Sequence, residues 1–291
     1  MLSYCQAIVI GFLQGVTELF PVSSLGHSVL IPELLGWDNL TKAESTESFF
    51  LAFLVALHVA TALALLFYYR KDWVRIVAGL ASSARERRIT TPDARLGMLL
   101  IVATIPAGLV GLVFEHELRV VFAKPEAAAI FLMFNGVVLL VGEALRRRVA
   151  AGVGYRGDGF TGGRRIETLS YGEAFFIGCM QIGALFAGIS RSGITMVAGL
   201  MRGLDHEDSA RFAFMLATPI ILGAGLYKLP DLTGPLGNGI RGQVFVGAVV
   251  AGISAYLSTR FLVRFFETRT LTPFGIYCLA FGAFCAIYFA L

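Results

Sequence analysis

Charged side chains are scarce in this 291-residue sequence. Asp, Glu, Lys and Arg make up 15% of it, whereas soluble domains carry about 25%. Hydrophobic residues make up 56%, and the mean hydropathy is +0.74. The basic residues lie between apolar runs, so neither a soluble enzyme nor a nucleic-acid partner is supported. The composition predicts an all-α polytopic membrane protein.

Cysteine is also rare, and its four copies lie in apolar runs without the spacing of metal ligands: Cys5, Cys179, Cys278 and Cys285. We expect them to pack as small hydrophobic side chains, forming neither disulfides nor metal sites. The N-terminus lacks the basic residues with which a cleavable signal begins, so we expect no such signal.

Residues 14 to 28 (QGVTELFPVSSLGHS) place polar side chains inside an apolar stretch. No Lys or Arg precedes Lys42, so no nearby residue in the sequence neutralises Glu18. A carboxylate and an imidazole at the depth of membrane hydrocarbon, here Glu18 and His27, are costly and usually mark function. A soluble pair of buried helices with satisfied polar groups is the less favoured alternative.

The same stretch contains a helix breaker. We expect one helix over 4–20, a break at Pro21, and a second helix over about 24–35 that Ser23 or Ser24 caps. Each limb is too short to cross about 30 Å of hydrocarbon at about 1.5 Å per residue. The sequence therefore predicts a re-entrant hairpin whose buried tip can bind an anion at the N-terminus of its second limb.

Six longer apolar runs are expected to span the membrane: 49–69, 96–114, 125–145, 212–229, 243–263 and 271–290. Polar or basic loops are expected over 37–48, 70–95 and 146–170, the last of them Gly-rich and flexible. His58 lies in the first run, where we favour a hydrogen-bonded interior histidine over a ligand.

The positions of Lys and Arg predict the orientation. Placing loops 70–95 and 146–170 inside puts 18 basic residues on the cytoplasmic side and 5 outside, with Arg191 left over. Both termini then face away from the cytoplasm.

The sequence also matches itself at an offset of 167 residues. The matching pairs are Ala7/Ala174, Ile10/Ile177, Gly11/Gly178, Gln14/Gln181, Ser23/Ser190, Gly26/Gly193, Gly36/Gly203 and Pro106-x-Gly108/Pro273-x-Gly275. We therefore predict two repeats, about 1–145 and 171–291, joined by the connector 146–170. Each would contain one re-entrant helical hairpin and three transmembrane helices. Because three is odd, the repeats would have inverted topology, with the two hairpin tips meeting near the midplane.

The second predicted tip is the segment 187–195 (AGISRSGIT). Its hydroxyl groups and its glycine suit helix capping and close backbone approach: Ser190, Ser192, Gly193 and Thr195. Arg191 has a planar fork that suits bidentate phosphate binding. A buried ion pair with Glu18 that only joins the two hairpins is the structural alternative.

Two motifs, QGVTELFPVSSLGH (14–27) and AGISRSGIT (187–195), resemble the signatures of the bacterial undecaprenyl pyrophosphate phosphatases, the bacitracin-resistance membrane family. The segments ALHVAT (56–61), TIPAG (104–108) and RFAFMLATPIILGAGL (211–226) also resemble family segments, so the resemblance covers essentially the whole chain. The chain departs from the family pattern at three positions: Gln14 replaces the Glu of some members, Ala60 a usual Gly, and Ala187 a usual Pro.

This resemblance implies hydrolysis of undecaprenyl pyrophosphate to undecaprenyl phosphate and phosphate. The reaction recycles the lipid carrier of cell-wall (peptidoglycan) synthesis and confers bacitracin resistance. The resemblance also implies a multi-pass protein of the bacterial plasma (inner) membrane whose site opens to the outer, periplasmic face. A divalent cation, Mg²⁺ or Ca²⁺, would aid activity, and the chain would form a homodimer.

On this interpretation four residues are expected to be catalytic: Glu18, Ser24, His27 and Arg191. Ser24 would be the nucleophile, His27 the base and then the acid, and Arg191 the clamp on the pyrophosphate. Glu18 would orient His27, activate Ser24 or hold the metal ion.

Seven further residues are expected to bind substrate: Gln14, Ser23, Gly26, Ser190, Ser192, Gly193 and Thr195. Direct attack by water, without a phosphoserine, fits the same residues. A transporter that moves a lipid phosphate across the membrane also stays open, because inverted repeats with broken helices are typical of transporters.

Overall fold

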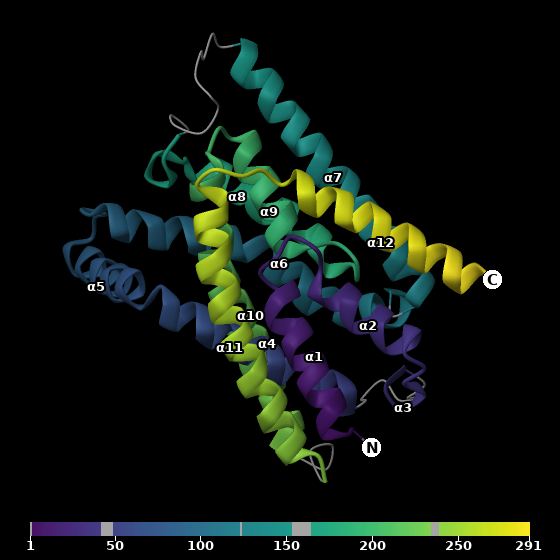
Figure 1. Cartoon of the computed structure of the whole chain (residues 1–291). Coiled ribbons are helices and arrows are strands. Elements are labelled where there is room, and N and C mark those ends of the chain that lie inside the picture. The colour runs from purple at the N-terminus through teal and green to yellow at the C-terminus, as the bar shows by residue number, and fades with distance from the viewer. Residues whose placement is uncertain (1, 42–48, 123, 153–163, 234–238) are drawn as a thin grey trace.

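A computed structural model of the chain describes residues 2–41, 49–122, 124–152, 164–233 and 239–291 (Figure 1). Parts of two predicted loops, 42–48 and 153–163, lie outside the described residues. The described residues are almost entirely helical and contain no β-strand beyond an isolated bridge between Arg164 and Leu204.

The helices, in chain order, are α1 (Tyr4–Thr17), α2 (Ser24–Leu34), α3 (Asp38–Thr41), α4 (Phe49–Tyr68), α5 (Arg70–Glu86), α6 (Pro92–Phe122), α7 (Pro125–Gly152), η1 (Ile166–Thr168), α8 (Tyr171–Gln181), η2 (Ile182–Leu185), α9 (Arg191–Met201), α10 (His206–Thr233), α11 (Arg241–Phe266) and α12 (Thr272–Ala290). All six predicted spans are helical. Five helices of the described residues are long and apolar enough to cross a membrane: α4, α6, α7, α11 and α12. The protein is therefore a multi-pass membrane protein, with α10 a sixth long helix.

Two pairs of short helices are each interrupted by a break, as the sequence predicts. α1 leads to α2 through residues 18–23, and α8 leads through η2 and residues 186–190 to α9. The ends of these helices correspond at the offset of 167 residues. The equivalent features are capping boxes at Ser3 and Ser170, N-caps at Ser23 and Ser190, and positive φ angles of 62° at Gly36 and 86° at Gly203. The equivalent capping boxes were missed in the sequence comparison.

Two expectations are wrong. The predicted loop 70–95 contains α5, whose residues Ile76 and Leu80 lie against Gly97 of α6. The high charge of this segment conceals a helix whose residues Ile76 and Leu80 recur at helical spacing on the face toward α6. The match of Pro106 to Pro273 is not structural either, because Pro106 lies inside α6 whereas Pro273 begins α12.

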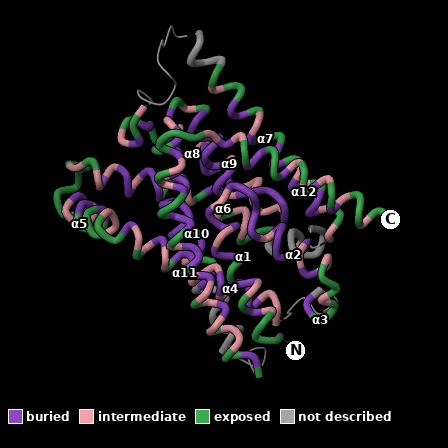
Figure 2. Tube along the Cα trace, viewed as in Figure 1, coloured by how far each residue is buried: buried purple, intermediate pink, exposed green. Residues whose placement is uncertain are grey.

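Small residues let the short helices approach the long ones closely. α1 crosses α11 where Gly11 faces Gly247, and α8 crosses α6 where Gly178 faces Ala103. A Cβ atom added at Gly11 or Gly178 would collide with a carbonyl oxygen of the facing helix. Such contacts are typical of helix association in membranes. They hold both breaks inside the bundle, where Figure 2 shows buried residues concentrated around α9 and the centre.

The four cysteines offer a test of the packing. All are free thiols: Cys5 is exposed, Cys179 half-buried, and Cys278 and Cys285 are buried. We expect a variant with Ser at 5, 179 and 278 and Ala at 285 to stay monodisperse in detergent. Its melting temperature should fall by only a few degrees, because Ser replaces the sulfur atom by a smaller oxygen atom and Ala removes only the sulfur atom. Gly178→Leu is the control expected to aggregate, and aggregation of the cysteine-free variant would contradict this account.

Candidate active site

The two breaks meet at the centre of the protein, where Asn135 of α7 joins them. Its Nδ2 donates to the Pro21 carbonyl at 3.0 Å, and its Oδ1 accepts from the Ser190 N–H at 3.0 Å. The side chain is completely buried. Asn135 therefore positions both tips at once. The sequence analysis did not select Asn135. The only feature that could have indicated it is a polar amide side chain within the predicted span 125–145.

Ser23 makes a second connection between the tips. Its Oγ accepts from the N–H groups of Gly26 and Gly188, both at 3.2 Å. Ser23 has a φ of 68°, which is uncommon for a residue other than glycine. Gly188 has a φ of 108°, and a Cβ there would lie 2.5 Å from the Ala128 carbonyl oxygen. The junction thus holds uncommon backbone conformations, as functional sites often do.

Four side chains converge on the buried carboxylate of Glu18, which is 7% exposed. Its Oε1 accepts a short hydrogen bond from Arg191 Nη2. Its Oε2 accepts from Gln14 Nε2 at 3.0 Å and from the Ser24 hydroxyl. The same oxygen lies 3.3 Å from His58 Nε2. The ion pair between the two tips, which was the structural alternative for Arg191, therefore forms, and its carboxylate has the donors that a buried charge requires.

One terminal nitrogen of the Arg191 guanidinium has no hydrogen-bond partner among the described residues. Nη2 binds Glu18, whereas Nη1 is buried and has no hydrogen-bond partner within the described part of the chain. Leaving such a nitrogen unpaired is costly, and an anionic oxygen is its best partner. The structural ion pair with Glu18 is therefore compatible with phosphate binding by the same side chain.

The ring nitrogens of His27 have partners other than Ser24. Its Nδ1 lies 2.7 Å from the Ser23 carbonyl oxygen, and its Nε2 lies 2.8 Å from the hydroxyl of Tyr277 on α12. The ring also stacks on Tyr277 and Phe281. Because a carbonyl oxygen only accepts, we assign the proton of the neutral ring to Nδ1, which leaves Nε2 as the basic atom.

The remaining predicted residues of the second tip mainly build the tip itself. The hydroxyls of Ser190 and Ser192 lie 3.0 Å apart. Gly193 donates its N–H to Ser190 Oγ at 3.1 Å, and Thr195 donates to the Arg191 carbonyl at 2.6 Å. These bonds fix the start of α9, and so the direction in which the Arg191 side chain leaves it.

His58 belongs to the site, although the sequence interpretation placed it only in the interior. Its Nδ1 lies 2.8 Å from the Leu54 carbonyl oxygen, and its side chain is 26% exposed. The interior assignment is confirmed, and the contact with Glu18 adds a role. The feature that could have indicated this role in the sequence is an imidazole within a predicted membrane span.

The side chains present do not form a ready metal site. Within the described residues, no group of three or more His, Cys, Asp or Glu could hold a metal ion. Both carboxylate oxygens of Glu18 already accept hydrogen bonds from the protein. A cation bound by Glu18 would therefore share the carboxylate with these donors.

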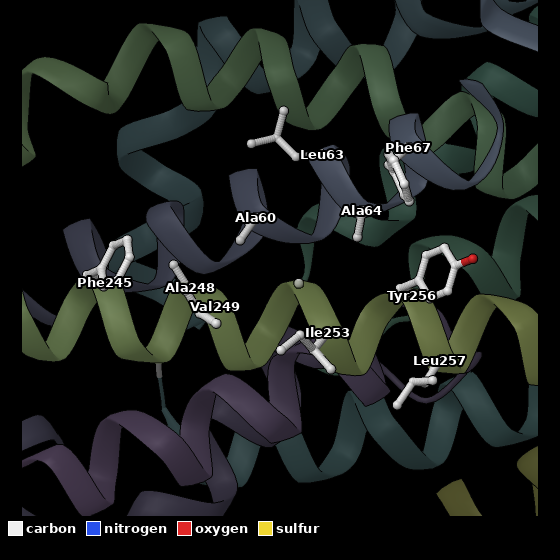
Figure 3. A pocket seen from close by; sticks show the side chains of 11 residues that line it. Ala60, Leu63, Ala64, Phe67, Phe245, Ala248, Val249, Ile253, Tyr256 and Leu257 are labelled. Carbon is white, nitrogen blue, oxygen red and sulfur yellow. The ribbon is translucent and has the colours of Figure 1, made fainter. Parts of the chain in front are cut away.

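A groove of about 510 Å³ between α4 and α11 is separate from this polar cluster (Figure 3). It is lined by apolar and aromatic side chains, among them Phe67, Phe245 and Tyr256, and the described lining includes no charged residue. Ala60 of α4 lines the groove, whereas His58, two residues earlier, contacts Glu18. Residues two apart lie on opposite sides of a helix, so the groove faces away from the site.

The chain resembles known proteins over its whole length. A family model described as "Bacitracin resistance protein BacA" matches residues 7–284. "Undecaprenyl-diphosphatase 2" of Frankia alni is 52% identical, covering 100% of this chain and 99% of the relative. "Undecaprenyl-diphosphatase" of Mycolicibacterium paratuberculosis is 54% identical, covering 100% and 98%. "Undecaprenyl-diphosphatase" of Granulibacter bethesdensis is 47% identical, covering 98% and 97%. The chain therefore belongs to the BacA family of bacitracin resistance proteins.

Proposed function

We propose that this chain is an undecaprenyl-diphosphatase, which hydrolyses undecaprenyl pyrophosphate to undecaprenyl phosphate and phosphate. The observation that carries the proposal is a single buried carboxylate, Glu18, bonded to both the Ser24 hydroxyl and Arg191 where two broken helices meet. Relatives that are 52% and 54% identical over the full chain bear the corresponding name. Bacitracin resistance follows from recycling of the lipid carrier.

In the first step Ser24 Oγ attacks the terminal phosphorus of the pyrophosphate. A bond forms between Oγ and phosphorus, the bond from phosphorus to the bridging oxygen breaks, and undecaprenyl phosphate leaves. The hydroxyl proton passes to Glu18, to which Ser24 already donates. Arg191 Nη1 binds the phosphoryl oxygens, where positioning and charge stabilisation supply most of the catalysis. N–H groups in the first turns of α2 and α9 add donors.

In the second step water attacks the phosphoserine. Its oxygen bonds to phosphorus, the bond to Ser24 breaks, and Ser24 regains its proton from Glu18 as phosphate leaves. His27 Nε2 accepts the proton of the water, so the Tyr277 hydroxyl must release this atom first. Direct attack of water on the pyrophosphate, with His27 or Glu18 as base, is the alternative.

A divalent cation, Mg²⁺ or Ca²⁺, is proposed to act together with the substrate. Hard cations bind phosphate oxygens and one or two carboxylates. The pyrophosphate would supply most of the ligands, with Glu18 as the available carboxylate. When bound, the cation would neutralise charge on the pyrophosphate.

The proposed topology is an inverted repeat, with α1–α7 and α8–α12 as its halves and the two broken pairs as re-entrant hairpins. The equivalent caps at the offset of 167 residues support it, as do the equivalent crossings of α1 on α11 and of α8 on α6. α5 occurs in the first half only. The charge count supports placing both termini outside the cytoplasm. The location in the inner membrane and a site that opens outward are proposed from the resemblance to the family.

A lipid-phosphate transporter is the second candidate, because broken helices are common in transporters. It would need an anion site such as Arg191 but no nucleophile. The Ser24 hydroxyl bonded to a carboxylate favours hydrolysis.

Arg191→Lys is expected to lower turnover about 100-fold, the usual effect of removing one charge-stabilising donor. A lysine ammonium cannot hold Glu18 with one nitrogen and phosphate with another. The measurement is phosphate release from a long-chain prenyl pyrophosphate in detergent. Arg75→Lys, at a side chain 53% exposed, is the control. Near wild-type turnover by Arg191→Lys would exclude Arg191 as the clamp.

Ser24→Ala and His27→Ala are expected to abolish turnover while leaving substrate binding largely intact, because both groups act on the reacting atoms. Substrate affinity and single-turnover rates would be measured for each variant. Ser28→Ala is the matched control, since this buried hydroxyl on α2 has no partner among the described residues. Substantial turnover by Ser24→Ala would indicate direct attack by water. Loss of binding in folded His27→Ala would make His27 a phosphate or metal ligand.

Reporter fusions at the two termini should both be active outside the cytoplasm, as the distribution of basic residues predicts. An alkaline phosphatase fusion would be active and a fluorescent cytoplasmic reporter dark at either end. A C-terminus inside the cytoplasm would refute the inverted repeat.

A further inference from the structure

An aromatic stripe runs along α12 from the candidate active site toward the C-terminal end of the helix. It consists of Tyr277, Phe281, Phe284 and Tyr288, which share one helix face by their spacing. Ring centroids of successive members lie 5.7, 6.4 and 6.2 Å apart. The four residues, called here the α12 stripe, form a continuous row of rings.

The α12 stripe begins at a proposed catalytic residue. The ring of His27 stacks on Tyr277 at 5.8 Å and on Phe281 at 5.3 Å between centroids. The Tyr277 hydroxyl lies 2.8 Å from His27 Nε2. The α12 stripe therefore begins beside α2, the helix that also carries Ser24. α2 and α12 both extend from the centre of the protein toward the same side (Figure 1).

Packing within the protein accounts for Phe281, which lies partly buried against the core, but not for the other three members of the α12 stripe. Tyr277, Phe284 and Tyr288 are 42%, 55% and 53% exposed. α12 instead packs on α7 through small residues of another face, where Gly275 lies against Gly136 and Gly282 against Met133. In a membrane-spanning helix the exposed rings face hydrocarbon. They present a rigid apolar surface at little cost in side-chain entropy.

We propose that the α12 stripe binds the polyisoprenyl tail of the substrate; this assignment rests on the proposed phosphatase function. From Tyr277 to Tyr288 the helix rises by about 16 Å, enough for several prenyl units. Planar double bonds and methyl groups of such a tail can lie flat on ring faces. The groove between α4 and α11 is a poorer candidate because it faces away from His58 and Glu18.

The test compares two substrates in two double variants. Phe284→Ala/Tyr288→Ala removes the half of the α12 stripe remote from His27. Phe67→Ala/Phe245→Ala is the matched control, since these rings line the other groove and are 58% and 69% exposed. Phosphate release in detergent would be measured with undecaprenyl pyrophosphate and with the short-chain farnesyl pyrophosphate.

The first variant should show about a 10-fold lower kcat/KM for undecaprenyl pyrophosphate, because two ring contacts are lost. The change should lie in KM rather than kcat, since contacts to the tail are equal in the ground and transition states. Turnover of farnesyl pyrophosphate should be unchanged, and the control variant should behave as wild type.

Three outcomes would overturn the assignment. In the first two, the Phe284→Ala/Tyr288→Ala variant keeps the wild-type kcat/KM for undecaprenyl pyrophosphate, or it loses kcat/KM equally for farnesyl pyrophosphate. The third is an equal loss of kcat/KM in the control variant. Absence of phosphate release by the wild type from either substrate would instead refute the phosphatase function. If the alanine variant does not fold, Phe284→Leu/Tyr288→Leu keeps the apolar surface and should raise KM less.

A long-chain prenyl pyrophosphate carrying a terminal diazirine provides a direct measurement. Labelling of α12 supports the proposal, and labelling confined to α4 and α11 contradicts it.

Discussion

The ion pair between Arg191 and Glu18 is the contact on which the rest of the structure depends. The two residues lie 173 positions apart, on different broken helices, and both are largely buried. Removing two charges from water is expensive, and their attraction offsets this only when the remaining hydrogen-bonding groups are also satisfied. Gln14, Ser24 and His58 provide those groups for the carboxylate. The pair is therefore stable only when α1, α2, α4 and α9 are all in place.

Much of the surrounding architecture serves to bring the two breaks to one point. Asn135 holds both with a single amide, and Ser23 bonds across to Gly188. Crossings at Gly11 and Gly178 let the short helices lie close against long ones, which keeps the unpaired backbone of each break inside protein. In hydrocarbon a break is tolerated only under that condition. The polar site therefore depends on the close helix packing that these small residues allow.

The sequence predicted those features that have local causes. Pro21 ends α1, and the serine hydroxyls of Ser23 and Ser190 cap the next helices, so both breaks and their equivalence could be derived. Arg191 could be considered as a partner of Glu18 from charge, as the alternative to phosphate binding, since it alone was left over by the topology. Asn135 and Tyr277 could not be selected, because their roles arise from contacts with residues more than 100 positions away. The partners of the His27 ring could not be predicted for a related reason. Neighbouring positions on a helix do not fix side-chain direction, and the aromatic rings of α12 set that of His27.

The carboxylate of Glu18 both pairs with Arg191 and is the proposed acceptor of the Ser24 proton. Glu18 holds Arg191 through one oxygen and accepts from Ser24 through the other. In the proposed mechanism, a phosphate that binds Arg191 Nη1 therefore shares its guanidinium with the carboxylate that receives the proton of Ser24. The proposal thus couples substrate binding and activation of Ser24 through a single side chain. Such coupling requires Arg191 to have a free nitrogen while paired, which a guanidinium allows and an ammonium does not. The same requirement explains why the ion pair that joins the two halves also lies at the centre of the proposed chemistry.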